Sequence, residues 1–137
     1  MSLPRILTIM GSGETAPTMV STHRTLTALL PKPVKAVLLD TPYGFQENAP
    51  ELATRAVEYF RNSVNVDIAV AGLVRLHDTH IAADTVQIER GLRAISDATY
   101  IFAGPGSPTY ALRQWSGSNV ASSIIDKLMN GGIVTFA

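Results

Sequence analysis

The residues best suited to chemistry in this sequence form a short turn, 104–108, that reads Gly-Pro-Gly-Ser-Pro. Gly104 and Gly106 can adopt backbone conformations that other residues avoid, and they let a second molecule approach the chain closely. Ser107 followed by Pro108 is typical of a helix start, because the serine hydroxyl can accept a hydrogen bond from the first helical turn. A strand, a glycine turn and a helix N-terminus together direct backbone N–H groups outward, where they favour an anion or an oxyanion. The sequence therefore predicts a functional site at this turn.

Ser107 itself does not fit the pattern of a catalytic nucleophile. A nucleophile elbow has the pattern Gly-x-Ser-x-Gly, with a small residue two positions after the serine. That position is Thr109 here, and Pro108 has no N–H to offer to an oxyanion. We therefore expect Ser107 to cap the helix that follows.

A second glycine-containing segment, 11–16, fits the Gly-x-Gly-x-x-Ala pattern of dinucleotide-binding turns. Asp40, at the end of the second apolar run, stands where such proteins carry the acid that binds the ribose. Against this function, Glu14 would place a carboxylate beside the pyrophosphate, and Pro17 removes an N–H from the helix start. A tight strand-to-helix turn explains the same residues, so a nucleotide-binding module is the alternative interpretation.

Three further polar residues, His77, Asp78 and His80, lie close together in one expected loop. They lack a third ligand at a defined helical spacing, so we expect no metal site there. The sequence contains no cysteine, which excludes a thiolate metal site, a disulfide and a cysteine nucleophile within these residues.

Apolar runs of strand length alternate with helical segments along the chain. The expected strands span 5–10, 34–39, 66–74, 100–103 and 133–136. The expected helices span 17–30, 50–60, 82–95, 108–115 and 120–129. Uninterrupted apolar strands that alternate with helices indicate a parallel sheet covered on both faces. The sequence therefore predicts a three-layer α/β fold of the flavodoxin-like type, with a mostly parallel sheet.

Ligands bind such sheets beyond the carboxyl ends of the strands, at a topological switch point. This rule places the loops 11–14, 40–48, 75–80 and 104–109 at the functional edge. From these loops and the helix start that follows the last one, the expected substrate contacts are Gly13, Glu14, Tyr43, Ser107, Thr109 and Tyr110. We expect Trp115 to be a packing residue and His23, on the inner face of the first helix, to be half-buried.

The composition describes a single globular domain, 1–137, rather than a disordered chain. Hydrophobic residues make up 46% of the chain and charged ones 16%, which suits a compact core. Eleven basic and eleven acidic side chains cancel, so nothing in the charge favours nucleic acid or an anionic membrane as a partner. There is no signal peptide and no apolar run of about eighteen residues, and we expect a cytoplasmic location.

The end of the sequence, 133–137, reads as a strand of the buried, central type. A domain rarely stops there, because the next residues would form another loop of the functional edge. We therefore expect the domain to be incomplete at its C-terminal end and to belong to a longer protein. An incomplete sheet exposes an apolar edge or face, which favours association into homo-oligomers.

The order of elements from Glu89 to Ala137 resembles the class I glutamine amidotransferase-like superfamily. The closest resemblance is to its serine-hydrolase branch, which contains dipeptidase E and cyanophycinase. The features that carry it are the helix residues 89–95, the strand and turn 102–112, and the pair Gly131-Gly132 before the last strand. The segments 11–14 and 39–48 resemble a less-studied subgroup of the same superfamily.

This resemblance implies that the turn stands where these proteins carry a Gly-Gly-Asp-Gln-type loop, which lines the substrate site and supplies a backbone oxyanion donor. Gly104 matches that loop, but Pro105 has no N–H, and Gly106 and Ser107 replace the acidic and amide side chains. The donors expected on this side of the oxyanion are therefore the N–H groups near Gly104 and Gly106.

The resemblance also implies a serine-type hydrolase that acts by acyl transfer on an amide or peptide bond, with a peptide or small molecule as substrate and no cofactor. Its nucleophile would follow Ala137 directly, and its histidine and acid would come later. We therefore expect the catalytic residues to lie beyond this chain, which alone would be inactive.

Overall fold

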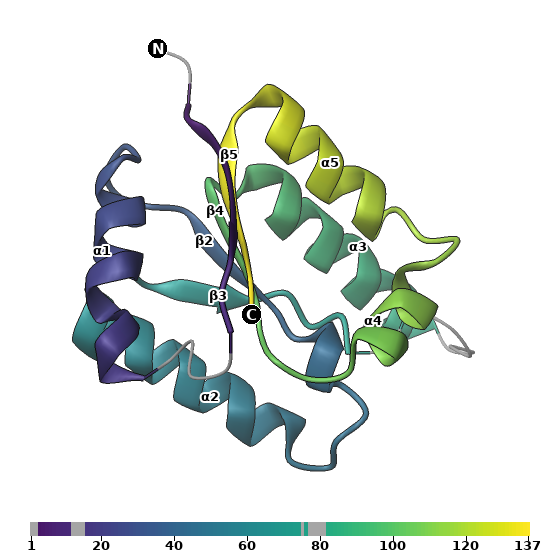
Figure 1. Ribbon diagram of the computed structural model, residues 1–137. Helices are drawn as coiled ribbons and strands as arrows, with labels where there is room; N and C mark the ends of the chain where they lie inside the picture. Colours follow the sequence, from purple (N-terminus) through teal and green to yellow (C-terminus); the bar gives the residue numbers. More distant parts are fainter. Residues whose placement is uncertain (1–2, 12–15, 75, 77–81) are drawn as a thin grey trace.

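The computed structural model describes residues 3–11, 16–74, 76 and 82–137 of the chain. Figure 1 shows a central sheet with helices packed against it. The strands are β1 (Arg5–Ile9), β2 (Ala36–Leu39), β3 (Ile68–Val70), β4 (Tyr100–Ala103) and β5 (Gly132–Phe136). The helices are α1 (Val20–Ala28), α2 (Ala49–Tyr59), α3 (Ala82–Asp97), α4 (Pro108–Trp115) and α5 (Val120–Asn130). A 3₁₀ turn, Thr41–Tyr43, follows β2.

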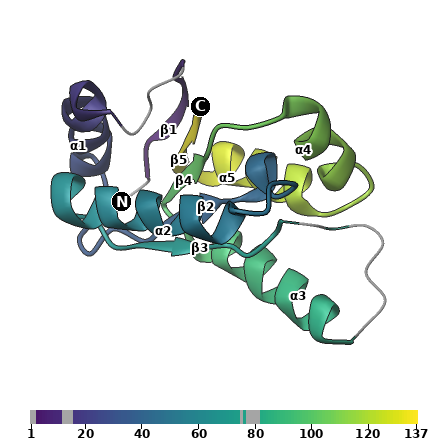
Figure 2. The same cartoon turned by 90° about the horizontal axis from the view of Figure 1, so that it is seen from below.

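The five strands form one sheet in the order β1-β5-β4-β2-β3, and every neighbouring pair is parallel. Two views show α1 and α2 on one face of the sheet and α3, α4 and α5 on the other (Figures 1 and 2). This is the predicted three-layer, flavodoxin-like architecture. The chain continues from β2 toward one edge of the sheet and from β4 toward the other, so the switch point lies between these two strands.

The two faces of the sheet have separate cores. Leu38, Phe102 and Ile133 pack under α1 and α2, whereas Leu39, Ile101 and Val134 pack under α3 and α5. Alternate residues of β2, β4 and β5 therefore enter opposite cores, which is why these strands are almost entirely apolar.

A buried polar side chain, His23, lies in the core under α1 and α2. His23 is fully buried rather than half-buried as expected, and its Nδ1 is hydrogen-bonded to the Tyr100 hydroxyl at 2.9 Å. The Thr135 hydroxyl donates to the same tyrosine oxygen at 3.2 Å. Burial raises the pKa of Tyr100 to about 12, so the phenol stays protonated and can donate to the imidazole.

The edge strands differ from the prediction of uniformly covered strands. Exposed and half-buried residues alternate along β1, and only the first residue of β3 is buried. The third strand is also shorter than the expected 66–74. It ends where Gly72 takes a positive φ of 75° and the N–H of Leu73 turns to a side-chain acceptor, Asp40.

Candidate functional site

The turn after β4 packs directly against the loop after β2, at the switch point of the sheet. The N–H of Ser107 donates to the carbonyl of Pro42 at 2.8 Å and so joins the two segments. Gly106 has a φ of 156°, and a Cβ atom there would overlap the carbonyl group of Pro42. A Cβ on Gly104 would lie 2.7 Å from Cε1 of Tyr43. Both glycines therefore permit the close approach of the two loops.

Ser107 has the capping role that the sequence predicts. It precedes α4 with an extended backbone, and its Oγ accepts a hydrogen bond from the N–H of Tyr110 at 3.1 Å. Pro108 occupies the first helical position, where its missing N–H has no cost. The hydroxyl of Ser107 is thus engaged by the helix that it starts.

Of the two candidate oxyanion donors, the N–H groups of Gly104 and Gly106, the structure leaves one available to a ligand. The N–H of Gly104 donates to the carbonyl of Leu39 at 3.3 Å as part of the sheet, and Pro105 has no N–H. Within the described part of the chain, the N–H of Gly106 has no hydrogen-bond acceptor. Gly106 is therefore the backbone donor of this turn that remains available to a ligand.

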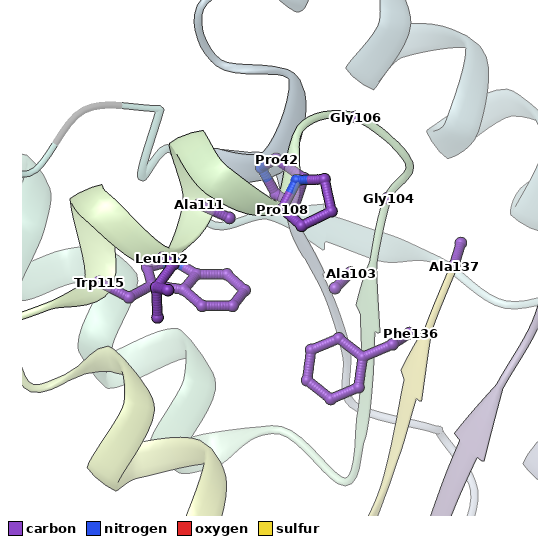
Figure 3. Close-up of a pocket in the computed structure, with 10 residues that line it drawn as sticks. All are labelled: Pro42, Ala103, Gly104, Gly106, Pro108, Ala111, Leu112, Trp115, Phe136 and Ala137. Atoms are coloured by element: carbon purple, nitrogen blue, oxygen red, sulfur yellow. The ribbon is translucent and has the colours of Figure 1, made fainter.

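An apolar cavity of about 350 Å³ lies beside Gly106, between α4 and the end of β5. Figure 3 shows the Trp115 indole and the Phe136 ring extending into it from opposite sides. No charged side chain lines it, and its lining residues are Pro42, Ala103, Gly104, Gly106, Pro108, Ala111, Leu112, Trp115, Phe136 and Ala137. The Nε1 atom of Trp115 is buried and has no hydrogen-bond partner among the described residues. The cavity therefore suits an apolar group.

The cavity residues on α4 were not among the expected site residues. Pro108, Ala111, Leu112 and Trp115 are spaced three and four positions apart, so they share one face of the helix. This spacing is visible in the sequence, but it fits an ordinary packing face equally well. Trp115 packs against the core as expected, and it also forms a wall of the cavity.

The expected substrate contacts take different positions around this cavity. The two glycines of the turn line it, whereas Thr109 is exposed on α4 and does not. The Tyr110 hydroxyl donates to the carbonyl of Val74 at 2.6 Å, and its ring packs against Phe45 with 5.4 Å between centroids. Tyr110 thus braces α4 against the neighbouring loops. Gly13 and Glu14 lie outside the described residues.

Tyr43 lies on the opposite side of the turn from the apolar cavity. Its side chain is buried among the residues under α2 and borders a smaller cavity of about 200 Å³, which Arg55 and Pro105 also line. Burial, and to a lesser extent the Asp40 carboxylate, raises the pKa of its phenol above the usual range. Its hydroxyl has no hydrogen-bond partner in the described segments.

Asp40 has a structural role at the end of β2. It is 4% exposed, and its Oδ1 accepts a hydrogen bond from the N–H of Leu73 at 2.9 Å. Burial raises the pKa of this carboxyl, an effect that the backbone hydrogen bonds partly oppose. Next to it, the Thr41 hydroxyl donates to the Leu73 carbonyl at 2.5 Å. Both side chains hold the chain after β3 against the end of β2, so Asp40 has a structural role in the fold.

Most of the glycine segment of the nucleotide-binding alternative, 12–15, lies outside the described residues, as do His77, Asp78 and His80. Across the ranges that the structure does describe, no three histidine or acidic side chains come together to hold a metal ion. None of the helices, as far as they are described, has the length and apolar character needed to cross a membrane.

Comparisons with known proteins support the fold of the chain, and they do not identify its family. The sequence matches no family model, and it matches no curated protein. In structure the chain is similar to a peptidase from an acI-B1 Actinobacterium, with a TM-score of 0.74 and 18% sequence identity. The match covers 95% of this chain and 52% of the peptidase, so the chain spans about half the length of that protein. The protein is thus a flavodoxin-like α/β domain with the fold of part of a peptidase, and an apolar cavity at its switch point.

Proposed function

We propose that this chain is the amino-terminal part of a serine-type hydrolase of the amidotransferase-like superfamily, in the branch of dipeptidase E and cyanophycinase. It would act by acyl transfer on an amide or peptide bond. The observation that carries the proposal is the free N–H of Gly106 at the wall of an apolar cavity, at the switch point where parallel sheets bind ligands. The similarity in fold to a peptidase supports the same reading.

In this proposal the chain supplies the stabilising side of the site and the following polypeptide supplies the reactive side. The N–H of Gly106 donates to the oxyanion of the tetrahedral intermediate, and one such donor is typically worth ~2.7–4 kcal/mol in the transition state. Ala137 is tied to β4 through its N–H, which donates to the Ala103 carbonyl at 3.2 Å, and it lines the same cavity. A nucleophile directly after Ala137 would therefore emerge at the rim of the cavity, close to the Gly106 turn.

The lining of the cavity indicates the class of substrate. Apolar side chains surround it, and a charged substrate group would lose its hydration there without a compensating partner. We therefore propose that the group flanking the scissile carbonyl is apolar, as in a leucine or phenylalanine residue.

Binding can be tested on this chain alone, because Trp115 is its single tryptophan and reports on the cavity. Titration with N-acetyl-leucine amide is expected to shift the tryptophan emission saturably, whereas N-acetyl-aspartic acid amide is expected to leave it unchanged. Ala111→Leu fills the cavity and should abolish the shift. Ala28→Leu, on the exposed surface of α1, is the matched control and should retain it. Equal responses to the two amides would overturn the assigned substrate class.

Catalysis is tested separately on the parent protein. We expect a serine within the first few residues after Ala137, and hydrolysis of leucine-containing dipeptides by the complete polypeptide. Replacing that serine by alanine should abolish turnover and leave the tryptophan response to N-acetyl-leucine amide intact. A parent sequence with neither serine nor cysteine at this point would refute the hydrolase assignment.

A further inference from the structure

Helix α4 presents two different faces to the rest of the molecule. The face that includes Ala111 and Trp115 lines the apolar cavity. Tyr110 and Gln114 precede these residues by one position each and are four positions apart, so they share a neighbouring face. Both side chains reach the segment 74–76, which follows β3. Because β3 and β5 lie on opposite sides of the pair β4–β2, this second face is directed away from the end of β5.

Two hydrogen bonds of opposite direction join this second face to the segment 74–76. The Tyr110 hydroxyl donates to the carbonyl of Val74 at 2.6 Å. The Oε1 atom of Gln114 accepts the N–H of Leu76, also at 2.6 Å. Gln114 and Leu76 are both buried, so this second bond is shielded from water. Separating the helix from the segment would leave buried polar groups without partners, which is costly.

The segment 74–76 is itself held against the end of β2. Leu73, directly before it, donates its N–H to the buried carboxyl of Asp40 at 2.9 Å. On another side, a Cβ atom added to Gly44 would overlap the carbonyl of Val74, so the two backbones are in close contact. The segment therefore forms a fixed support for α4, because it cannot move with the helix without breaking these contacts.

The cavity side of α4 is subject to the opposite tendency. The walls of the cavity are apolar, so bringing them together would remove apolar surface from water and add van der Waals contacts. A movement of α4 toward Phe136 would do this. The hydrogen bonds of Tyr110 and Gln114 oppose such a movement, since they hold the helix toward the β3 side of the sheet.

We propose that Tyr110 and Gln114 are positioning residues, which hold α4 away from the end of β5 and so keep the cavity wide enough for a branched or aromatic side chain. Neither residue lines the cavity. They act through the helix on Ala111 and Trp115, which do line it. The inference rests on the proposed function only for the identity of the ligand, because the cavity and the two hydrogen bonds belong to the ligand-free chain.

The width of the cavity is tested first without a ligand, by acrylamide quenching of Trp115, the single tryptophan. Tyr110→Phe keeps the ring beside Phe45 but loses the hydroxyl, and Gln114→Met keeps the side-chain length but loses the acceptor. If α4 moves toward β5, the indole becomes more enclosed, and the quenching constant should fall about twofold in each variant. A helix that only loosened would expose the indole, and the constant would rise instead.

Two matched control variants remove hydrogen bonds of the same kind elsewhere. Tyr59→Phe, on α2, loses the hydroxyl that donates to the carbonyl of Ala16 at 3.1 Å. Gln87→Met, on α3, loses the amide that donates to the carbonyl of Ala71 at 3.1 Å. Neither residue lines the cavity, so both variants should be quenched as the wild type is. Circular dichroism confirms that each variant is folded, and the substitutions on α4 are measured singly, so that each tests the proposal by itself.

The size of the bound ligand gives a second readout, because a mere loss of folded protein would weaken every ligand equally. Titrations compare N-acetyl-leucine amide with N-acetyl-alanine amide. The ratio of their affinities should fall about tenfold in Tyr110→Phe and Gln114→Met, since a narrower cavity still accepts the smaller side chain. The two control variants should keep the wild-type ratio.

An unchanged or increased quenching constant in the variants on α4, or an unchanged affinity ratio, would overturn the proposal. Failure of both amides to bind the wild type would refute the proposed substrate class instead. The quenching measurement would still decide whether Tyr110 and Gln114 hold the cavity open, so the two proposals fail separately.

Discussion

At the residue scale, Gly106 combines two requirements that only glycine meets. Its φ of 156° is unfavourable for residues with a side chain, and a Cβ atom would meet the carbonyl of Pro42. The sequence indicated that glycines matter in this turn, from the composition of 104–108 alone. The sequence does not show that the N–H of Gly104 donates to the Leu39 carbonyl, because that hydrogen bond depends on which strand lies next to β4.

We expect Gly106→Ala to lower the free energy of unfolding by about 1–3 kcal/mol, since it adds a steric overlap to an unfavourable backbone conformation. Urea denaturation followed by circular dichroism measures the change. Gly117→Ala is the control, because Gly117 also has a positive φ, 73°, but nothing within 4 Å of its Cβ position. An equal loss in the two variants would mean that the contact with Pro42 contributes nothing.

Asp40 illustrates a residue whose role the sequence pattern misrepresents. An acid after a strand at the functional edge looks like a ligand-binding group, yet its carboxylate is buried and accepts the N–H of Leu73. Burial raises its pKa above 3.8, so the folded protein binds the proton more tightly than the unfolded chain does. Stability then falls as the pH rises through the window just above 3.8.

Asp40→Asn keeps an oxygen acceptor for Leu73 but cannot ionise. We expect the variant to be more stable than the wild type at neutral pH, with the difference shrinking to nothing below pH 3.8. Thermal melts of both proteins between pH 3 and 7 measure it, with intervals set around the reference pKa. A difference that grows toward acid pH would show that the ionised carboxylate stabilises the fold.

At the element scale, the alternation of apolar runs and helices predicted the order of all strands and helices, and it predicted the bounds of the strands other than β3 closely. The failures are at the sheet edges. The run that forms β1 is mostly apolar, and its sequence does not identify it as an edge strand. Its alternating exposure follows from the strand order, which is a long-range property. The C-terminal end of β3 is likewise followed by a contact that the local sequence does not show, since the N–H of Leu73 donates to Asp40 after β2.

The start of α4 was predictable because its signal is local. We expect Ser107→Ala to cost about 1 kcal/mol of stability, since the N–H of Tyr110 loses its acceptor. Thr109→Ala, in the same first turn but exposed and without a capping bond, should cost less than half as much. Chemical denaturation of the two variants side by side measures the difference. A cost for Ser107→Ala no larger than that for Thr109→Ala would contradict the capping role.

At the scale of the whole molecule, the fold and the position of the turn 104–108 at the switch point were predictable, whereas the shape of the cavity beside this turn was not. The switch-point rule located the turn 104–108, because it depends only on the order of strands and helices. The cavity arises from the way α4 lies over the end of β5, and this packing brings Trp115 and Phe136 together from positions far apart in the sequence. Of the expected contacts, Tyr43 and Tyr110 were displaced from the cavity by their own packing.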